Sequence, residues 1–196
     1  MKKLIWNIEY LSLPLVIKYC KKCGSEAKFI CSEKFRVNAQ KKALDIWLIY
    51  KCCGCDNTWN ARIYEHITAQ ALGKKILEDF YSNNFSLVKK YAMDAEFLYN
   101  NGITAICLPE YLVKGEDFSL EETVELEIKS RFALPLKAAS VIRNKMGLTQ
   151  NEYLQMIGSG KIKSVFGQDL RKCRIKKSIK LVFNKPDMRD DKNTCI

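Results

Sequence analysis

Two Cys-x-x-Cys pairs constrain the fold of this chain more than any other feature of its sequence. Cys20 and Cys23 form the first pair, Cys52 and Cys55 form the second, and 28 residues (24–51) separate them. Each pair can form a knuckle, a tight turn that directs two thiolates at one ion while backbone N–H groups bond the sulfur atoms. We therefore predict that these four cysteines bind one structural zinc ion in a tetrahedral site.

The residues beside the pairs indicate which cysteines bind. Gly24 and Asp56 follow the two pairs directly and tolerate the unusual backbone angles of a knuckle. Cys53 would form only a C-x-C pair with Cys55, which is too short for a knuckle, so Cys52 is the predicted ligand. The other cysteines have no partner at the required spacing and are expected to act as small apolar residues: Cys31, Cys107, Cys173 and Cys195.

The segment between the pairs is predicted to form an antiparallel sheet. Residues 29–37 and 43–50 are rich in β-branched and aromatic side chains, and a polar connection spans 38–42. Residues 58–64 would add a third strand. A short antiparallel sheet with knuckles at one end is typical of a zinc ribbon. So small a sheet buries little apolar surface, and the metal would contribute directly to its folding free energy.

A thioredoxin-like redox pair is the alternative for either motif. Such a pair lies at the N-terminus of a helix in a βαβ unit, and neither pair here precedes a helical pattern.

We also expect a cytoplasmic protein without a membrane span. Asn7 and Glu9 interrupt the apolar N-terminal run, and no window approaches the ~20 apolar residues that a membrane span needs. In a reducing compartment, clustered cysteines bind metals more often than they form disulfides.

Helical patterns follow the ribbon. Apolar residues at helical spacing predict central helices over 72–100, with Asn84 and Asp94 as N-caps. Three short strands come next, the last of which alternates as a surface strand should: 103–108, 111–113 and 122–129.

The C-terminal third predicts two short helices and two strands. Helical spacing begins at Leu134, Gly147 stops the first helix, and Thr149 caps the second. Strands are expected at 162–165 and 179–183, which makes a helix–turn–helix-like module with a small sheet.

These elements predict an α+β fold that is divided into consecutive parts. The zinc ribbon, with an N-terminal strand at 4–9, spans residues 1–66, and an acidic helical connector with short strands spans 67–130. A basic module spans 131–184, and a tail spans 185–196.

The net charge of +11 is spread unevenly over these parts. Residues 1–66 contain 12 basic and 6 acidic side chains, residues 67–130 contain 6 and 11, and residues 131–196 contain 15 and 5. Two basic ends of this size favour binding to a polyanion, most simply nucleic acid, although a lysine-rich surface can also be merely solvated. The candidate phosphate contacts are Lys161, Lys163, Arg171, Lys172, Arg174, Lys176 and Lys177, assisted by Lys34, Arg36, Lys41 and Lys42 on the ribbon.

Enzymatic activity is not expected. The chain contains no H-E-x-x-H motif, no Gly-rich phosphate loop and no nucleophile elbow, and it has a single histidine. A zinc ion saturated by four thiolates also offers no open position for water.

The run CSEKFRVNAQKK at 31–42, followed by LDIWLIYKC at 44–52 and TWN at 58–60, resembles a bacterial family catalogued as domain of unknown function 1062. The resemblance spans nearly the whole chain, and the two cysteine pairs of the family fall on Cys20, Cys23, Cys52 and Cys55. Membership of this family implies no particular function.

Residues 134–183 are similar in outline to the alpha-L RNA-binding motif of the ribosomal small-subunit protein four type. Gly147-Leu-Thr149, the exit Gly158-Ser-Gly160-Lys-Ile162 and the strand at 179–182 fit that motif. The first helix lacks the usual Arg-Leu-Asp start, and the second opens with Gln150-Asn-Glu152 in place of basic residues. The resemblance therefore implies contacts with structured RNA through the lysines and arginines on the strand side.

The main hypothesis is a non-enzymatic zinc-ribbon protein that binds nucleic acid, and structured RNA in particular. One alternative is a protein–protein adaptor that docks a partner on Trp47, Tyr50 and Trp59. Another is a redox or zinc-sensing regulator, which would need labile cysteines.

Overall fold

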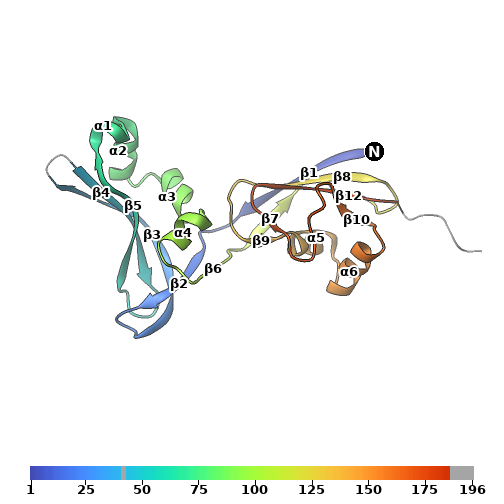
Figure 1. Ribbon diagram of the computed structural model, residues 1–196, viewed down its shortest axis with the longest axis horizontal. Helices are drawn as coiled ribbons and strands as arrows, with labels where there is room; N and C mark the ends of the chain where they lie inside the picture. Colours follow the sequence, from blue (N-terminus) through green and yellow to red (C-terminus); the bar gives the residue numbers. More distant parts are fainter. Residues whose placement is uncertain (41–42, 186–196) are drawn as a thin grey trace, which may run out of the picture. The chain divides into compact units, whose positions relative to one another are not determined.

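Two five-stranded sheets organise the chain, one in each of two units (Figure 1). The computed structural model describes residues 1–40 and 43–185, so Lys41, Lys42 and the predicted tail beyond residue 185 lie outside the described residues. Tyr10–Tyr111 and Phe132–Pro135 form what we call the cysteine unit. Met1–Glu9, Leu112–Arg131 and the chain from Leu136 onward form the terminal unit. With six helices in the described residues, the predicted α+β class is confirmed.

The sheet of the cysteine unit has the strand order β5-β4-β3-β2-β6, and its neighbouring strands are all antiparallel. The predicted strands at 29–37, 43–50 and 58–64 are confirmed, and each extends further than expected. Strand β2, which carries the first cysteine, was not predicted. The bounds are β2 (Leu15–Cys20), β3 (Ser25–Gln40), β4 (Ala43–Cys52), β5 (Thr58–Thr68) and β6 (Ala105–Cys107).

Four short helices lie between β5 and β6 in the sequence, and each supplies buried residues to the core beside the sheet. The side-chain oxygen of Asn84 accepts hydrogen bonds from the N–H groups of Ser86 and Leu87, and that of Asp94 accepts one from Phe97, so both predicted N-caps are confirmed. None of the described helices is long and apolar enough to cross a bilayer. The bounds are α1 (Ala69–Leu72), α2 (Lys74–Tyr81), α3 (Phe85–Ala92) and α4 (Ala95–Asn100).

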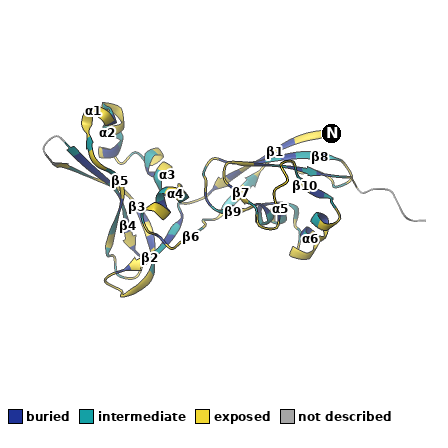
Figure 2. Cartoon of the chain, in the orientation of Figure 1, coloured by how far each residue is buried: buried dark blue, intermediate teal, exposed yellow. Residues whose placement is uncertain are grey.

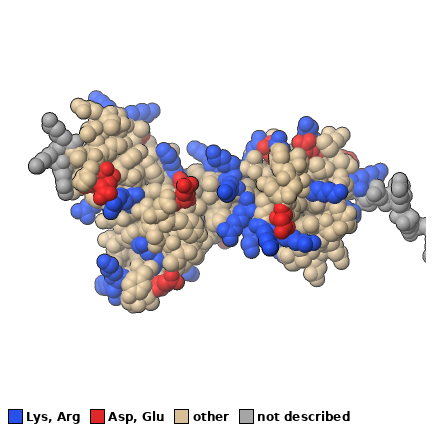
Figure 3. Space-filling view, in the orientation of Figure 1, with Lys and Arg blue, Asp and Glu red and all other residues tan. Residues whose placement is uncertain are grey.

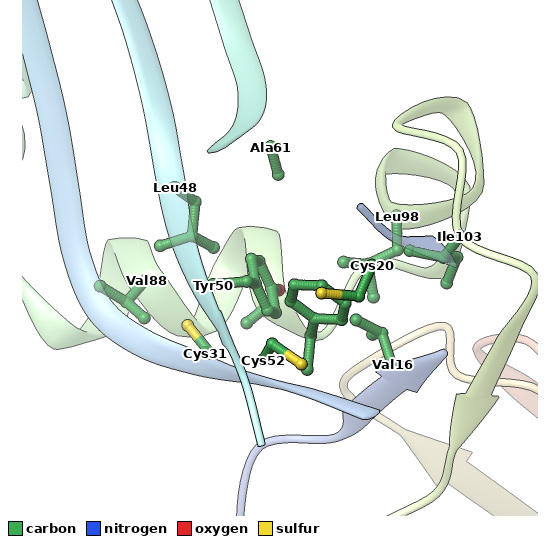
Figure 4. Packing of buried hydrophobic residues seen from close by; sticks show 12 residues of the cluster. Val16, Cys20, Cys31, Leu48, Tyr50, Cys52, Ala61, Val88, Leu98 and Ile103 are labelled. Carbon is green, nitrogen blue, oxygen red and sulfur yellow. The ribbon is translucent and has the colours of Figure 1, made fainter. Parts of the chain in front are cut away.

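Helices and strands of the cysteine unit pack together in two clusters of buried residues, the larger of which is shown in Figure 4. Leu48 and Tyr50 from β4 are fully buried together with Val88 from α3 and Leu98 from α4. The helices that the sequence predicted within the acidic connector at 67–130 complete the core beside these strands. The reason is that a sheet with one apolar face must bury that face against another layer.

The sheet of the terminal unit has the strand order β10-β12-β8-β1-β7. Strands β1 and β8 are parallel, with Leu4 opposite Leu126 and Trp6 opposite Ile128, whereas β12 is antiparallel to β8 and to β10. The bounds are β1 (Lys2–Tyr10), β7 (Tyr111–Lys114), β8 (Val124–Ser130), β10 (Ile162–Ser164) and β12 (Ser178–Phe183).

The N-terminal strand predicted at 4–9 is confirmed, although the sequence grouped it with the zinc ribbon. Strand β1 lies between β7 and β8 in the terminal unit, and not beside the ribbon strands. The segment at 122–129 was expected as a surface strand, whereas β8 is a central strand with Leu126 and Ile128 fully buried (Figure 2). Alternation identifies a strand with one buried face, but it does not identify the strand's neighbours.

The two predicted C-terminal helices are α5 (Ala138–Met146) and α6 (Gln150–Gly158). Gly147 ends α5 in the left-handed region with a φ of 66°, and Thr149 forms a capping box with Glu152 at the start of α6. Helix α5 begins later than predicted, because Leu136–Lys137 (β9) instead pairs with Arg174–Ile175 (β11).

Two isoleucines in β1 test its place in the terminal sheet. Ile8 is buried and Ile5 is 48% exposed. We expect Ile8→Ala to lower the free energy of unfolding of the terminal unit by about 2–5 kcal/mol, because it removes buried apolar packing. Ile5→Ala should cost less than about 1 kcal/mol.

Hydrogen exchange of the β8 amides in denaturant would measure both effects. Equal losses of protection in the two variants would contradict the buried face assigned to β1.

Candidate metal centre

Both predicted knuckles are present in the cysteine unit. The N–H of Gly24 donates to the carbonyl oxygen of Cys20 (2.9 Å), and the N–H of Asp56 donates to that of Cys52 (3.0 Å). Gly24 and Asp56 have φ angles of 71° and 55°. This left-handed region is tolerated best by glycine, and by asparagine or aspartate among other residues. The turn residues predicted from the sequence therefore have the predicted backbone conformation.

The two turns bring four sulfur atoms together. The Sγ atoms of Cys20, Cys23, Cys52 and Cys55 all lie within 4.8 Å of one another. The distance between Sγ of Cys20 and Sγ of Cys55 is 3.6 Å, and that between Cys23 and Cys52 is 3.8 Å. Two thiolates on a tetrahedral zinc lie about 3.8 Å apart, because each Zn–S bond is about 2.3 Å long. The cluster therefore has the size of a four-thiolate site and could hold a metal ion.

Strand β3 explains why cysteines far apart in the sequence converge. It pairs with β2 on one side, where Cys20 lies opposite Ser25, and with β4 on the other, where Cys52 lies opposite Phe29. Both contacts are near the start of β3, so the ends of β2 and β4 lie at the same end of the sheet. The register of three strands thus positions the two knuckles.

Without a cation among them, the four clustered thiols cannot all lose their protons. A hydrogen bond from the backbone N–H of Cys23 lowers the pKa of Cys20 to about 6. In contrast, hydrogen bonding with the side chains of Cys55, Cys20 and Cys52 raises the pKa of Cys23 to about 12. A bound metal ion would remove this conflict, since its charge deprotonates the thiols that coordinate it.

The other described cysteines lie apart from this cluster. Cys53 is exposed, and its N–H donates to the carbonyl oxygen of Lys28 (2.8 Å). Cys31 is buried in the core, as predicted, and burial raises its pKa to about 11, so its thiol stays neutral. Cys107 and Cys173 are half-buried, and Cys195 lies outside the described residues.

The aromatic residues predicted to dock a partner do not form one exposed surface. Tyr50 is fully buried, and the ring of Trp59 packs against it with centroids 4.9 Å apart. Trp47 is half-buried, and the guanidinium of Arg36 lies 5.7 Å from its ring centroid. Tyr50 and Trp59 therefore contribute to the core.

The candidate phosphate contacts fall in both units. Lys34 and Arg36 are exposed on β3 of the cysteine unit, and Lys41 and Lys42 lie outside the described residues. The terminal unit holds the others, which are exposed except for the half-buried Lys161: Lys161, Lys163, Arg171, Lys172, Arg174, Lys176 and Lys177.

Lys137 is a basic residue that the sequence did not single out. It lies directly opposite Arg174 in the β9–β11 pair. No local pattern could have identified it, because strands of two residues show no periodicity.

A protein-family model matches more than half of the chain. Residues 37–167 match the family model described as protein of unknown function (DUF1062). The chain belongs to this family. The DUF1062 match begins after Cys20 and Cys23 and includes Cys52 and Cys55, so it covers one half of the cysteine cluster.

No curated protein and no solved structure matches the chain. The membership predicted from the sequence is thus confirmed, and the resemblance to the alpha-L RNA-binding motif stays a prediction.

The adjacent residues Cys52 and Cys53 offer a matched test of the cluster. Cys52→Ser removes one of the four clustered sulfur atoms, so we expect the metal content of the purified protein to fall to near zero. Cys53→Ser should leave it unchanged, since that side chain is exposed outside the cluster. Elemental analysis of both variants would measure the metal content. If Cys53→Ser lost the metal and Cys52→Ser kept it, the assignment of Cys52 as a ligand would be wrong.

Proposed function

We propose that the cysteine cluster holds a structural zinc ion, and that this member of the DUF1062 family is a non-enzymatic zinc-ribbon protein that binds structured RNA. Four thiolates in a tetrahedral arrangement suit zinc, and they leave no coordination position for a water molecule. The ion would therefore stabilise the fold and would not catalyse a reaction. The separations of 3.6 and 3.8 Å between sulfur atoms support this part of the proposal.

The identity of the ion can be tested by metal analysis, and its structural role can be tested by removing it. We expect one zinc per chain, and we expect a chelator to reduce the protection of the β2 and β4 amides from hydrogen exchange, since the ion links the ends of these strands. The β8 amides of the terminal unit should be unaffected. Iron in place of zinc, or undiminished protection after complete removal, would contradict a structural zinc ion.

A basic segment of the terminal unit supports the RNA-binding part of the proposal. This segment, which we call the basic loop, runs from residue 159 to residue 180 and includes the short strands β10 and β11. Residues 159–180 contain eight basic side chains and a single acidic one, Asp169. Within the described chain, none of the seven candidate phosphate-binding residues in this segment forms an ion pair. Figure 3 shows Lys and Arg side chains gathered over the part of the terminal unit that contains β7 and β9.

The loop is held in place by its own contacts. Leu170 is buried, and its carbonyl oxygen accepts a hydrogen bond from the hydroxyl of Tyr153 (3.0 Å). The carboxylate of Asp169 accepts a hydrogen bond from the N–H of Arg171 (3.0 Å). Further along the chain, the side chain of Ile175 is also buried. Cations on an ordered segment lose less conformational entropy when they bind a ligand of fixed shape.

The observation that carries the proposal is the pairing of Lys137 with Arg174. Both side chains are exposed and lie directly opposite each other in the β9–β11 ladder. Like charges at such positions destabilise a strand pair. A polyanion bound across the two strands would reverse that effect, and the ordered phosphates of a structured RNA supply negative charge at fixed positions.

A charge-matched pair of double variants tests this surface. Lys172→Gln/Arg174→Gln removes two of the proposed phosphate-binding cations, whereas Lys74→Gln/Lys75→Gln removes two exposed charges from α2 of the cysteine unit. We expect the first variant to bind an RNA hairpin more weakly. The slope of log K against log salt should become less steep by about one for each phosphate that is no longer neutralised. The second should resemble the unmodified protein.

Fluorescence polarisation with a labelled hairpin over a salt series would measure both properties. An affinity of the unmodified protein that does not change with salt would falsify the phosphate-binding mechanism.

A further inference from the structure

A groove opens beside the cysteine cluster within the cysteine unit. Its volume is about 670 Å³, within the range of cavities that bind small ligands. None of its nine lining residues is acidic, and three are lysines. The lining residues that matter for a ligand are Lys18, Lys21, Lys22 and Trp59.

Lys18 is a fixed cation in this groove. Its Nζ donates to the carbonyl oxygens of Asn101 (3.1 Å) and Gly102 (2.8 Å) and lies 4.8 Å from the centroid of the Trp59 ring. An ammonium group has three donors, so one remains for a ligand. An anionic group of a ligand in the groove can accept that third hydrogen bond.

Lys21 and Lys22 add exposed charge at the wall of the groove. Both lie between the two cysteines of the first knuckle, so the turn that positions the sulfur atoms also positions them. Lys22 Nζ makes a long hydrogen bond of 3.4 Å to the carbonyl oxygen of Cys55. These two lysines could simply balance the negative charge of a zinc ion bound by four thiolates, and that role requires no ligand.

The exposed part of the Trp59 ring suits a nucleobase. This half-buried ring is held by Tyr50 and Phe29, with centroids 4.9 and 6.1 Å away. A basic groove that exposes an aromatic ring is typical of single-stranded nucleic-acid binding.

We propose that this groove binds an unpaired nucleotide of an RNA chain, with the phosphate at the three lysines and the base against the exposed part of Trp59. The choice of RNA as the ligand rests on the function proposed above, while the site is separate from the basic loop of the terminal unit. An acidic peptide would use the lysines but would gain little from the aromatic ring.

The test uses the full-length, metal-loaded protein and a short single-stranded RNA. We expect Lys21→Gln/Lys22→Gln to bind this RNA more weakly, with a salt slope lower by about 0.7 for each phosphate that is no longer neutralised. Trp59→Leu should also weaken binding, by less than the roughly hundredfold that loss of a fully stacked base can cost, because Tyr50 and Lys18 already cover part of the ring. Lys74→Gln/Lys75→Gln is the charge-matched control and should bind as the unmodified protein does.

Metal content and folding are measured for each variant, so the lysine variant stays informative even if Trp59→Leu fails to fold. Unchanged affinity in Lys21→Gln/Lys22→Gln would overturn the groove site and leave those lysines as charge balance for the metal. If hairpin binding still depended on Lys172 and Arg174, the function proposed above would stand without the groove. A polyglutamate peptide that binds with the same dependence on Lys21 and Lys22, while single-stranded RNA does not bind, would overturn the nucleotide assignment.

Discussion

The cysteine unit depends on the convergence of four thiols at one end of a sheet. Four sulfur atoms within 4.8 Å cannot all carry negative charge unless a cation lies among them. An ion bound there would link the end of β2 to the end of β4, with β3 hydrogen-bonded between them. The same link would fix the first knuckle, and with it the lysines that line the groove. One ion could thus stabilise both the fold and a binding surface.

The terminal unit relies on a different device, a parallel strand from the far end of the sequence. Leu4 and Trp6 of β1 lie opposite Leu126 and Ile128 of β8, and all four are buried. On this scaffold the basic loop is ordered by Leu170 and Ile175, which are buried between exposed cations. The two units therefore present positive charge in different ways. One uses the turn between two of the clustered cysteines, and the other uses a loop anchored in an apolar core.

Local patterns predicted the local features of this structure well. Gly24 and Asp56 adopt the expected left-handed conformation, and Asn84, Asp94 and Thr149 cap helices as expected. These features depend on the chemistry of a few adjacent residues, so they can be recognised without the rest of the chain. The choice of Cys52 over Cys53 rested on the same kind of evidence, and the structure places Cys52 in the cluster.

The sequence by itself determined the α+β class, most strands and helices, and the four cysteines that meet. Only the tertiary structure decided which strands are neighbours. It placed β1 beside β8, packed the central helices against the strands of the cysteine unit in particular, and set Lys137 opposite Arg174. The physical reason is that spacing and capping are local, whereas strand partners are chosen by burial of apolar faces from distant segments. The groove beside the cluster arises in the same way, because Lys18 and Trp59 belong to different strands.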